Sequence, residues 1–292
     1  MRKAILTPLL LGACLLALAP LPVMAADNPA PVALPDTESW DMPAADGQIY
    51  RIFVSRPTGD APADGYPVLY VLDGNAMFAG FAEARRIQSV YSYGLDKMIV
   101  VGIGYPGDKP YDPRRMGDFT GPITQPALKA LYKDFPSGGR DRFQAFLVDR
   151  LRPEIDKRFK THPMRQSLYG HSLGGLFALH LLYNRPGAFH TIIAASPSIW
   201  WDAQSILAEE QDFTARLRKD PALGRGSRLI ILVGEREETE VTVMDGQALA
   251  RRLEPLSAFG LRSSFTVLDG ETHITVPARS VTLALRAAMQ WP

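Results

Sequence analysis

The stretch that decides the fold is Ser167-Leu-Tyr-Gly-His-Ser-Leu-Gly-Gly-Leu-Phe-Ala-Leu179. A short apolar run enters Gly170-His171-Ser172-Leu173-Gly174, and a helical pattern over Leu176–Tyr183 leaves it. This is G-x-S-x-G between a strand and a helix, where the turn is so tight that glycines must flank the serine. We therefore predict Ser172 as a nucleophile. The alternative is a glycine-rich turn that only packs a helix on a sheet.

Strand and helix patterns alternate on both sides of this motif. The continuous apolar runs Pro67–Leu72 and Met98–Ile103 are typical of strands buried on both faces of a parallel sheet. Other strands are predicted at Ser39–Pro43, Gln48–Arg56, Thr191–Ala195, Arg228–Val233 and Ser263–Leu268, and helices at Asn75–Tyr93, Asp141–Phe159, Ala203–Lys219, Val243–Phe259 and Pro277–Met289. The pattern predicts an α/β fold with a mainly parallel sheet of about eight strands flanked by helices. The intervening 104–140 stretch is expected to be a long functional loop.

The composition is that of a globular protein. The chain has 292 residues, of which 46% are hydrophobic and 22% charged, and its formal net charge is +1. These values fit a sizeable core and indicate neither disorder nor a membrane bundle. They also give no reason to expect nucleic acid or a membrane surface as a partner. The oligomeric state is left open.

The N-terminal 26 residues read as a signal peptide. Arg2-Lys3 supplies the positive region, Ala4–Leu21 is apolar, and Val23-Met24-Ala25 resembles a cleavage site. We expect a periplasmic protein without membrane insertion once the signal is removed, and a mature chain without cysteine if the cut follows Ala25. A lipoprotein anchored at Cys14 is the alternative. Residues 27–38 then form a linker, and 39–292 a single domain.

A serine nucleophile needs a base and a group that orients the base. In a fold of this kind the chain order is serine, acid, histidine, each in a loop after a strand. His273 lies between the last predicted strand and the last helix, so we predict it as the base. The alternative is a solvent-exposed loop histidine. His180 fits packing, His162 a structural turn, and His190 a capping or surface position. His171 is a poor base, because side chains adjacent on such a turn diverge.

The acid is expected after the strand that ends at Gly234. An acid three residues beyond the glycine that ends the strand is the usual spacing, and it selects Glu237. Glu235 and Glu238 remain open, as does a serine–histidine pair oriented without an acid. The amides of Leu173 and of Gly74, or Asn75 beside it, are the predicted oxyanion donors.

Several motifs resemble one family. They are Leu72-Asp73-Gly74-Asn75-Ala76-Met77-Phe78, Val101-Gly102-Ile103-Gly104-Tyr105-Pro106, Tyr111-Asp112-Pro113-Arg114-Arg115 with Asp118-Phe119-Thr120, and Ser196-Pro197-Ser198-Ile199-Trp200-Trp201. Together they resemble the esterase-D-like esterases, and within that group the exported trilactone siderophore esterases. The resemblance covers the chain from about Trp40 onward.

The resemblance implies an α/β-hydrolase fold and hydrolysis of the serine-lactone esters of enterobactin-like catecholate siderophores, with release of iron in the periplasm. It implies Ser172 and His273 as the catalytic pair, Gly74 and Leu173 as oxyanion donors, and Arg114-Arg115 as a basic siderophore-binding stretch. Some members rely on a serine–histidine dyad, which leaves the role of Glu237 open.

The expected substrate explains why arginine and tryptophan are candidate binding residues. A ferric tris-catecholate is a negatively charged aromatic body, and arginine suits it through charge and ring stacking. Arg114, Arg115 and Trp200 are therefore predicted to bind substrate. The alternatives are surface salt bridges for the arginines and packing for the tryptophan.

Two other functions compete with siderophore hydrolysis. One is another carboxylesterase or acyltransferase of the same fold, acting on feruloyl, acetyl or thiol esters. The other is a non-catalytic binder, which the intact Ser172 and His273 disfavour. No cofactor is expected, and no metal, because the histidines are scattered and there is no cysteine cluster. Any iron would arrive with the substrate.

Overall fold

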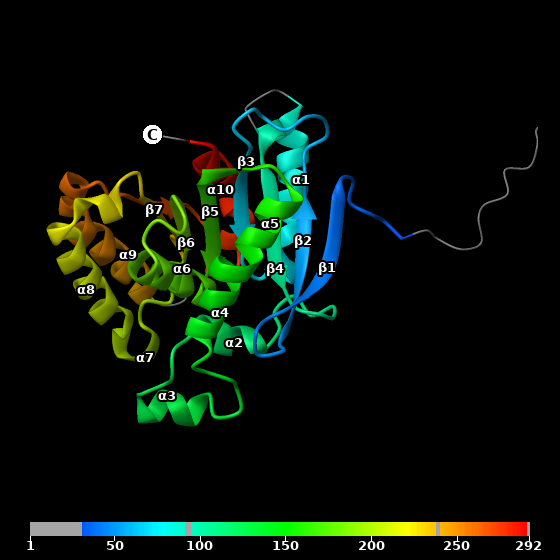
Figure 1. Cartoon of the computed structure of the whole chain (residues 1–292). Coiled ribbons are helices and arrows are strands. Elements are labelled where there is room, and N and C mark those ends of the chain that lie inside the picture. The colour runs from blue at the N-terminus through cyan, green and yellow to red at the C-terminus, as the bar shows by residue number, and fades with distance from the viewer. Residues whose placement is uncertain (1–30, 91–94, 238–239, 291–292) are drawn as a thin grey trace, which may run out of the picture. The chain divides into compact units, whose positions relative to one another are not determined.

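A computed structural model describes residues 31–90, 95–237 and 240–290, and the part from Leu34 onward forms one compact unit. Its centre is an eight-stranded sheet with the order β1-β2-β4-β3-β5-β6-β7-β8 (Figure 1). Both pairs that involve β2 are antiparallel and the remaining pairs are parallel. The strands are β1 (Thr37–Pro43), β2 (Ile49–Ser55), β3 (Tyr66–Val71), β4 (Ile99–Gly104), β5 (Thr161–His171), β6 (Thr191–Ala195), β7 (Arg228–Gly234) and β8 (Arg262–Leu268).

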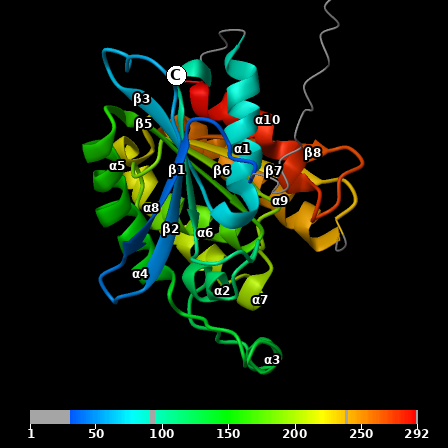
Figure 2. The same ribbon diagram turned by 90° about the vertical axis from the view of Figure 1, so that its right-hand side faces the viewer.

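Helices cover both faces of the sheet, which confirms the predicted α/β class (Figure 2). One face carries α1 (Gly74–Ser89) and α10 (Val276–Met289). The other carries α6 (Leu173–Asn184), α8 (Ile206–Lys219), α9 (Glu240–Leu253) and the helical segment formed by α4 (Arg140–Ala145), the π-helical turn η2 (Phe146–Leu151) and α5 (Arg152–Arg158). Every residue of β3 and β4 is buried, as their continuous apolar runs predict.

The 104–140 stretch differs from its prediction as an irregular loop. It contains α2 (Arg114–Phe119) and α3 (Pro126–Leu131), each of six residues. Helices this short show too few turns for an apolar stripe to appear in the sequence. The predicted helix over Ala203–Lys219 is likewise divided into α7 (Trp201–Gln204) and α8. Short 3₁₀ turns are η1 (Leu95–Lys97), η3 (Pro221–Gly224) and η4 (Glu254–Phe259).

The N-terminal predictions fall mostly outside the described residues. The signal peptide and Cys14 lie there entirely. Strand β1 begins at Thr37, which pairs with Ser55, so the last two residues of the predicted 27–38 linker belong to the sheet. Within the described part of the chain, no helix is long and apolar enough to span a membrane.

Candidate active site

Ser172 occupies the sharp turn between β5 and α6. Its backbone has φ 59° and ψ −119°, a strained conformation for a residue with a side chain. Gly170 makes the turn possible, because a Cβ there would lie 2.1 Å from the carbonyl oxygen of Gly174. The sequence thus places Ser172 on a tight strand-to-helix elbow that projects its hydroxyl.

His273 and Glu237 complete a chain of hydrogen bonds from this hydroxyl. The Oγ of Ser172 lies 3.0 Å from Nε2 of His273, and Nδ1 of His273 lies 2.7 Å from Oε2 of Glu237. Because the ionised carboxylate can only accept, Nδ1–H donates and leaves Nε2 to accept from the serine. Segments after β5, β7 and β8 thereby bring together the three side chains that the sequence predicts.

Glu237 is held as a buried carboxylate. Its side chain is 1% exposed, and its second oxygen accepts from Ser196 Oγ and from the Gly234 amide at 3.0 Å. Burial raises its pKa, but the hydrogen bonds from His273, Ser196 and Gly234 outweigh burial, so the pKa lies below its usual value.

The two other candidate glutamates do not share this position. Glu235 instead accepts from the Gly270 amide at 2.8 Å. Glu238 lies outside the described residues. Among the described glutamates of this loop, Glu237 is therefore the one in contact with His273.

The predicted oxyanion donors begin two helices. Gly74 is the first residue of α1 and Leu173 the first residue of α6, so neither amide has an intrahelical partner. Within the described ranges, neither has another backbone acceptor. Beside them, the side chain of Asn75 donates to the carbonyl oxygens of Tyr105 and Gly107 at 2.9 and 3.0 Å and accepts from the Tyr105 amide at 2.8 Å.

The three predicted substrate-binding side chains lie in different surroundings. Trp200 is 37% exposed. Arg114 bonds Asp112 at 3.2 Å and stacks over Tyr105. The side chain of Arg115 is only 13% exposed and donates to both carboxylate oxygens of Asp73, at 2.6 and 2.9 Å. Its charge is therefore already paired inside the protein.

Sequence reasoning assigned no role to three further residues at the site. Ser196 bonds Glu237, and Ser198 Oγ lies 3.3 Å from Ser172 Oγ. His171 donates from Nε2 to the carbonyl oxygen of His273 at 2.9 Å. Burial and the neighbouring His273 lower the pKa of His171 to about 3, so it is a neutral support for the His273 loop. The Ser-Pro-Ser motif and the histidine beside Ser172 were the available signals.

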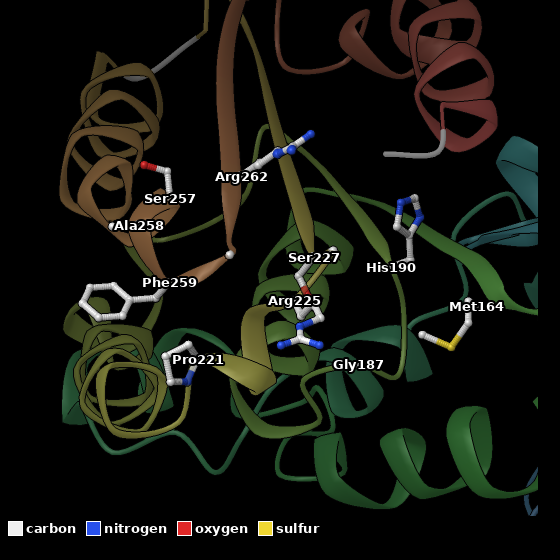
Figure 3. Close-up of a pocket in the computed structure, with 12 residues that line it drawn as sticks. Met164, Gly187, His190, Pro221, Arg225, Ser227, Ser257, Ala258, Phe259 and Arg262 are labelled. Atoms are coloured by element: carbon white, nitrogen blue, oxygen red, sulfur yellow. The ribbon is translucent and has the colours of Figure 1, made fainter.

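A cavity of about 620 Å³ lies at the opposite edge of the sheet (Figure 3). It is formed near the amino ends of β6, β7 and β8 and is lined by Arg225, Arg262 and His190 among others. It contains no sequence-predicted site residue, so the site assignment rests on hydrogen-bonding geometry. In the described ranges, no three His, Cys, Asp or Glu side chains are arranged to hold a metal ion.

Comparison with known proteins agrees with this geometry. The family described as "Putative esterase" matches residues 45–271, more than half of the chain. The chain belongs to this family. Its members are ester hydrolases, and its neighbours among solved structures share the α/β-hydrolase fold.

Relatives and solved structures extend the match over most of the chain. The ferri-bacillibactin esterase BesA of Bacillus subtilis is 37% identical over 88% of this chain and 90% of its own length. The siderophore enterobactin esterase of Emericella nidulans is 36% identical over 63% of this chain and 64% of its own length. The crystal structure of BES protein from Bacillus cereus covers 91% of this chain and 99% of its own, with 34% identity and a TM-score of 0.81.

Proposed function

We propose that the protein is a serine esterase that hydrolyses the trilactone esters of enterobactin-like catecholate siderophores. The observation that carries the proposal is the hydrogen-bonded chain from Ser172 through His273 to Glu237. The substrate class is supported by the names of relatives, which describe esterases of ferri-bacillibactin and of enterobactin.

In the first half of the proposed reaction, Ser172 Oγ attacks the ester carbonyl carbon while its proton passes to His273 Nε2, 3.0 Å away. The carbonyl oxygen becomes an oxyanion that the amides of Gly74 and Leu173 stabilise. The ester C–O bond then breaks, and the leaving alkoxide takes the proton from His273. An acyl group remains on Ser172.

In the second half, His273 takes a proton from water, and the resulting hydroxide attacks the acyl carbon. The carboxylic acid leaves, and Ser172 regains its proton. Glu237 acts through His273 in both halves, because its carboxylate fixes the ring and stabilises the imidazolium. Its lowered pKa keeps it ionised for this role.

The loops that follow the strands suit a broad aromatic ligand. Large apolar side chains are exposed on them, and we propose that these contact the aromatic rings of the siderophore. These side chains are Tyr111 (46%), Leu131 (71%), Phe135 (44%), Trp200 (37%) and Ile274 (71%). Arg114 lies on the same side, with 36% of its side chain exposed, and is the arginine we propose for contact with an anionic siderophore.

We also propose that a signal peptide within residues 1–26, cut after Ala25, exports the enzyme to the periplasm, where hydrolysis aids iron release. The positive pair Arg2-Lys3 and the apolar run that follows it support export. Intact mass of the secreted protein should match a chain starting at Ala26. A lipid-modified chain starting at Cys14 would instead indicate a membrane-anchored form.

The test of the substrate is a mass-spectrometric time course of the purified enzyme with ferric and iron-free enterobactin. We expect the trilactone to disappear and linear trimer, dimer or monomer to accumulate, with no change when Ser172→Ala is used. Survival of the trilactone while p-nitrophenyl butyrate is cleaved would reject the siderophore assignment and leave the esterase chemistry intact. Equal cleavage by Ser172→Ala would reject Ser172 as the nucleophile.

A further inference from the structure

A buried ion pair lies directly beside the predicted oxyanion hole. Asp73 occupies the N-cap position of α1 and immediately precedes Gly74, and its side chain is 2% exposed. Arg115 reaches it from α2, with Nε 2.6 Å from Oδ1 and Nη2 2.9 Å from Oδ2. The guanidinium also lies over the rings of Phe119 and Tyr111, at 5.1 and 5.5 Å from their centroids. All four groups are therefore fixed relative to one another.

The backbone of Asp73 is in a conformation that needs support. Its φ is 53° and its ψ is 47°, the left-handed region that most residues with side chains avoid and that aspartate adopts when its side chain is held by local hydrogen bonds. The direction of the Gly74 amide depends on this conformation, because Gly74 is the next residue. A bidentate arginine restricts the Asp73 side chain and, through it, the local backbone.

The charge of Asp73 lies close to the place where a second charge develops. Its Oδ2 is 3.6 Å from the position that a Cβ on Gly174 would occupy, so the carboxylate lies against the first turn of α6 beside Leu173. An uncompensated carboxylate there would repel an oxyanion bound by the Leu173 amide, since low-dielectric surroundings strengthen such interactions. The positive charge of Arg115 cancels that repulsion.

Helix α2 also contacts the turn around Gly74 through Tyr105. Asp118 accepts from the Tyr105 hydroxyl at 2.9 Å, and the Tyr105 amide donates to Asn75, the residue after Gly74. The two flanking residues of Gly74 are thus both tied to α2, one directly and one through Tyr105.

We propose that Arg115 is a positioning residue of the oxyanion hole, which holds Asp73 and the Gly74 amide in place and neutralises the Asp73 carboxylate. This replaces the predicted role of Arg115 as a siderophore ligand. The inference rests on the proposed serine mechanism, so the test includes Ser172→Ala as a separate arm.

The experiment compares steady-state kinetics on p-nitrophenyl butyrate, which is neutral, with kinetics on anionic ferric enterobactin. A lost oxyanion donor lowers kcat by about 10²–10³-fold, and a displaced donor loses part of that. We expect Arg115→Ala to lower kcat on the neutral ester by about 10-fold or more, with KM changed by less than about 3-fold. Arg115→Lys keeps the charge without the bidentate geometry and should recover part of the loss.

A double-mutant cycle tests the pairing itself. Asp73→Asn and Arg115→Gln should each lower kcat, while the double variant should lose no more than the worse single variant, because it leaves no unpaired buried charge. The matched control is Arg86→Ala. Arg86 makes a similar bidentate pair with Glu83, at 2.8 and 2.6 Å, on the exposed face of α1, and its removal should change kcat by less than about 2-fold.

Two results would overturn the inference. One is a kcat on the neutral ester within about 3-fold of wild type in Arg115→Ala; a KM raised only for the siderophore would then assign Arg115 to substrate binding. The other is multiplicative loss in the double variant. If Arg115→Ala fails to fold, Arg115→Gln decides by the same criteria. Normal activity in Ser172→Ala would instead defeat the serine mechanism, whatever Arg115 does.

Discussion

One edge of the sheet is formed by the carboxyl ends of its parallel strands and the other by their amino ends. The turns at these two edges differ in the residues that they hold at positive φ. Segments that follow the carboxyl ends of β3, β5 and β6 hold non-glycine residues at positive φ, namely Asp73, Ser172, Ser196, Asp202, Ala203 and Gln204. The turns near the amino ends of β6, β7 and β8 use glycine at positive φ, namely Gly187, Gly226 and Gly260. Glycine at positive φ also follows β4 and β8 at the carboxyl edge, at Gly107 and Gly270, so the difference is that non-glycine residues at positive φ gather in the segments that present the site.

The same contrast holds for arginine. At the carboxyl edge Arg115 is mostly buried and paired with Asp73. At the amino edge Arg225 and Arg262 line the pocket of Figure 3, are exposed, and form no salt bridge with another side chain in the described ranges. Arg115 is thus built into a fixed network, whereas Arg225 and Arg262 face solvent.

The largest expected effect separates two glutamates of one loop. Glu237→Gln should lower kcat by about 10³–10⁴-fold. The amide oxygen would keep the bonds from Ser196 and Gly234, so the amide NH2 would face Nδ1 of His273 and favour the wrong tautomer. Glu235→Gln is the matched control, since that carboxylate bonds the Gly270 amide and not His273, and it should change kcat by less than about 3-fold. Similar kinetics for the two variants on p-nitrophenyl butyrate would indicate a serine–histidine dyad.

The next largest expected effect is on the free energy of unfolding. Its pH dependence should have opposite signs for one titrating side chain at each edge of the sheet. Burial raises the pKa of Asp118 to about 6, so its ionisation destabilises the folded state as pH rises from about 4 to 6. Burial, Arg228 and Arg165 lower the pKa of His190 to about 4, so its protonation in the unfolded chain destabilises the fold as pH falls from about 6.5 to 4.

Urea unfolding at pH 4 and pH 7 measures both contributions to the free energy of unfolding. Each titrating side chain is replaced by asparagine, which is uncharged at both pH values. Relative to wild type, Asp118→Asn should gain about 3 kcal/mol of unfolding free energy as pH rises, because each pKa unit corresponds to about 1.36 kcal/mol. His190→Asn should lose a similar amount over the same range. The same sign for both variants would refute this account of the two edges.

The smallest expected effect comes from exchanging glycine and a residue with a side chain at positive φ, once at each edge of the sheet. Ser172→Gly should raise the unfolding free energy by about 1 kcal/mol while abolishing activity, because relief of about 1–3 kcal/mol of strain exceeds the entropy that glycine loses on folding. Gly226→Ala should lower it by about 1 kcal/mol, since its φ is 76° and an added Cβ meets nothing within 4 Å. Thermal unfolding measures both, and destabilisation by Ser172→Gly would mean that Ser172 is not strained.

Much of the fold could be predicted from the sequence because its strands are continuous and apolar. Pro67–Leu72 and Met98–Ile103 match β3 and β4 to within one residue at each end. The short α2 and α3 could not be predicted, because six residues with glycine or proline among them carry no clear period.

The candidate site likewise contains residues that the sequence could predict and a contact that it could not. Ser172, His273 and Glu237 follow strand ends, so chain order and spacing identify them as candidates. The pairing of Arg115 with Asp73 joins residues 42 positions apart and depends on how α2 folds back, which no local pattern encodes. The same arginine therefore fits a ligand role in the sequence and an internal role in the structure.

The central claim is that Ser172 is the nucleophile, and covalent labelling tests it most directly. The enzyme is treated with a fluorophosphonate and its peptides are mapped by mass spectrometry. We predict one adduct per chain, on Ser172, and none in Ser172→Ala. Ser198 is the informative alternative, because its Oγ lies only 3.3 Å from that of Ser172. An adduct on Ser198, or on Ser172 with undiminished ester hydrolysis, would contradict the account.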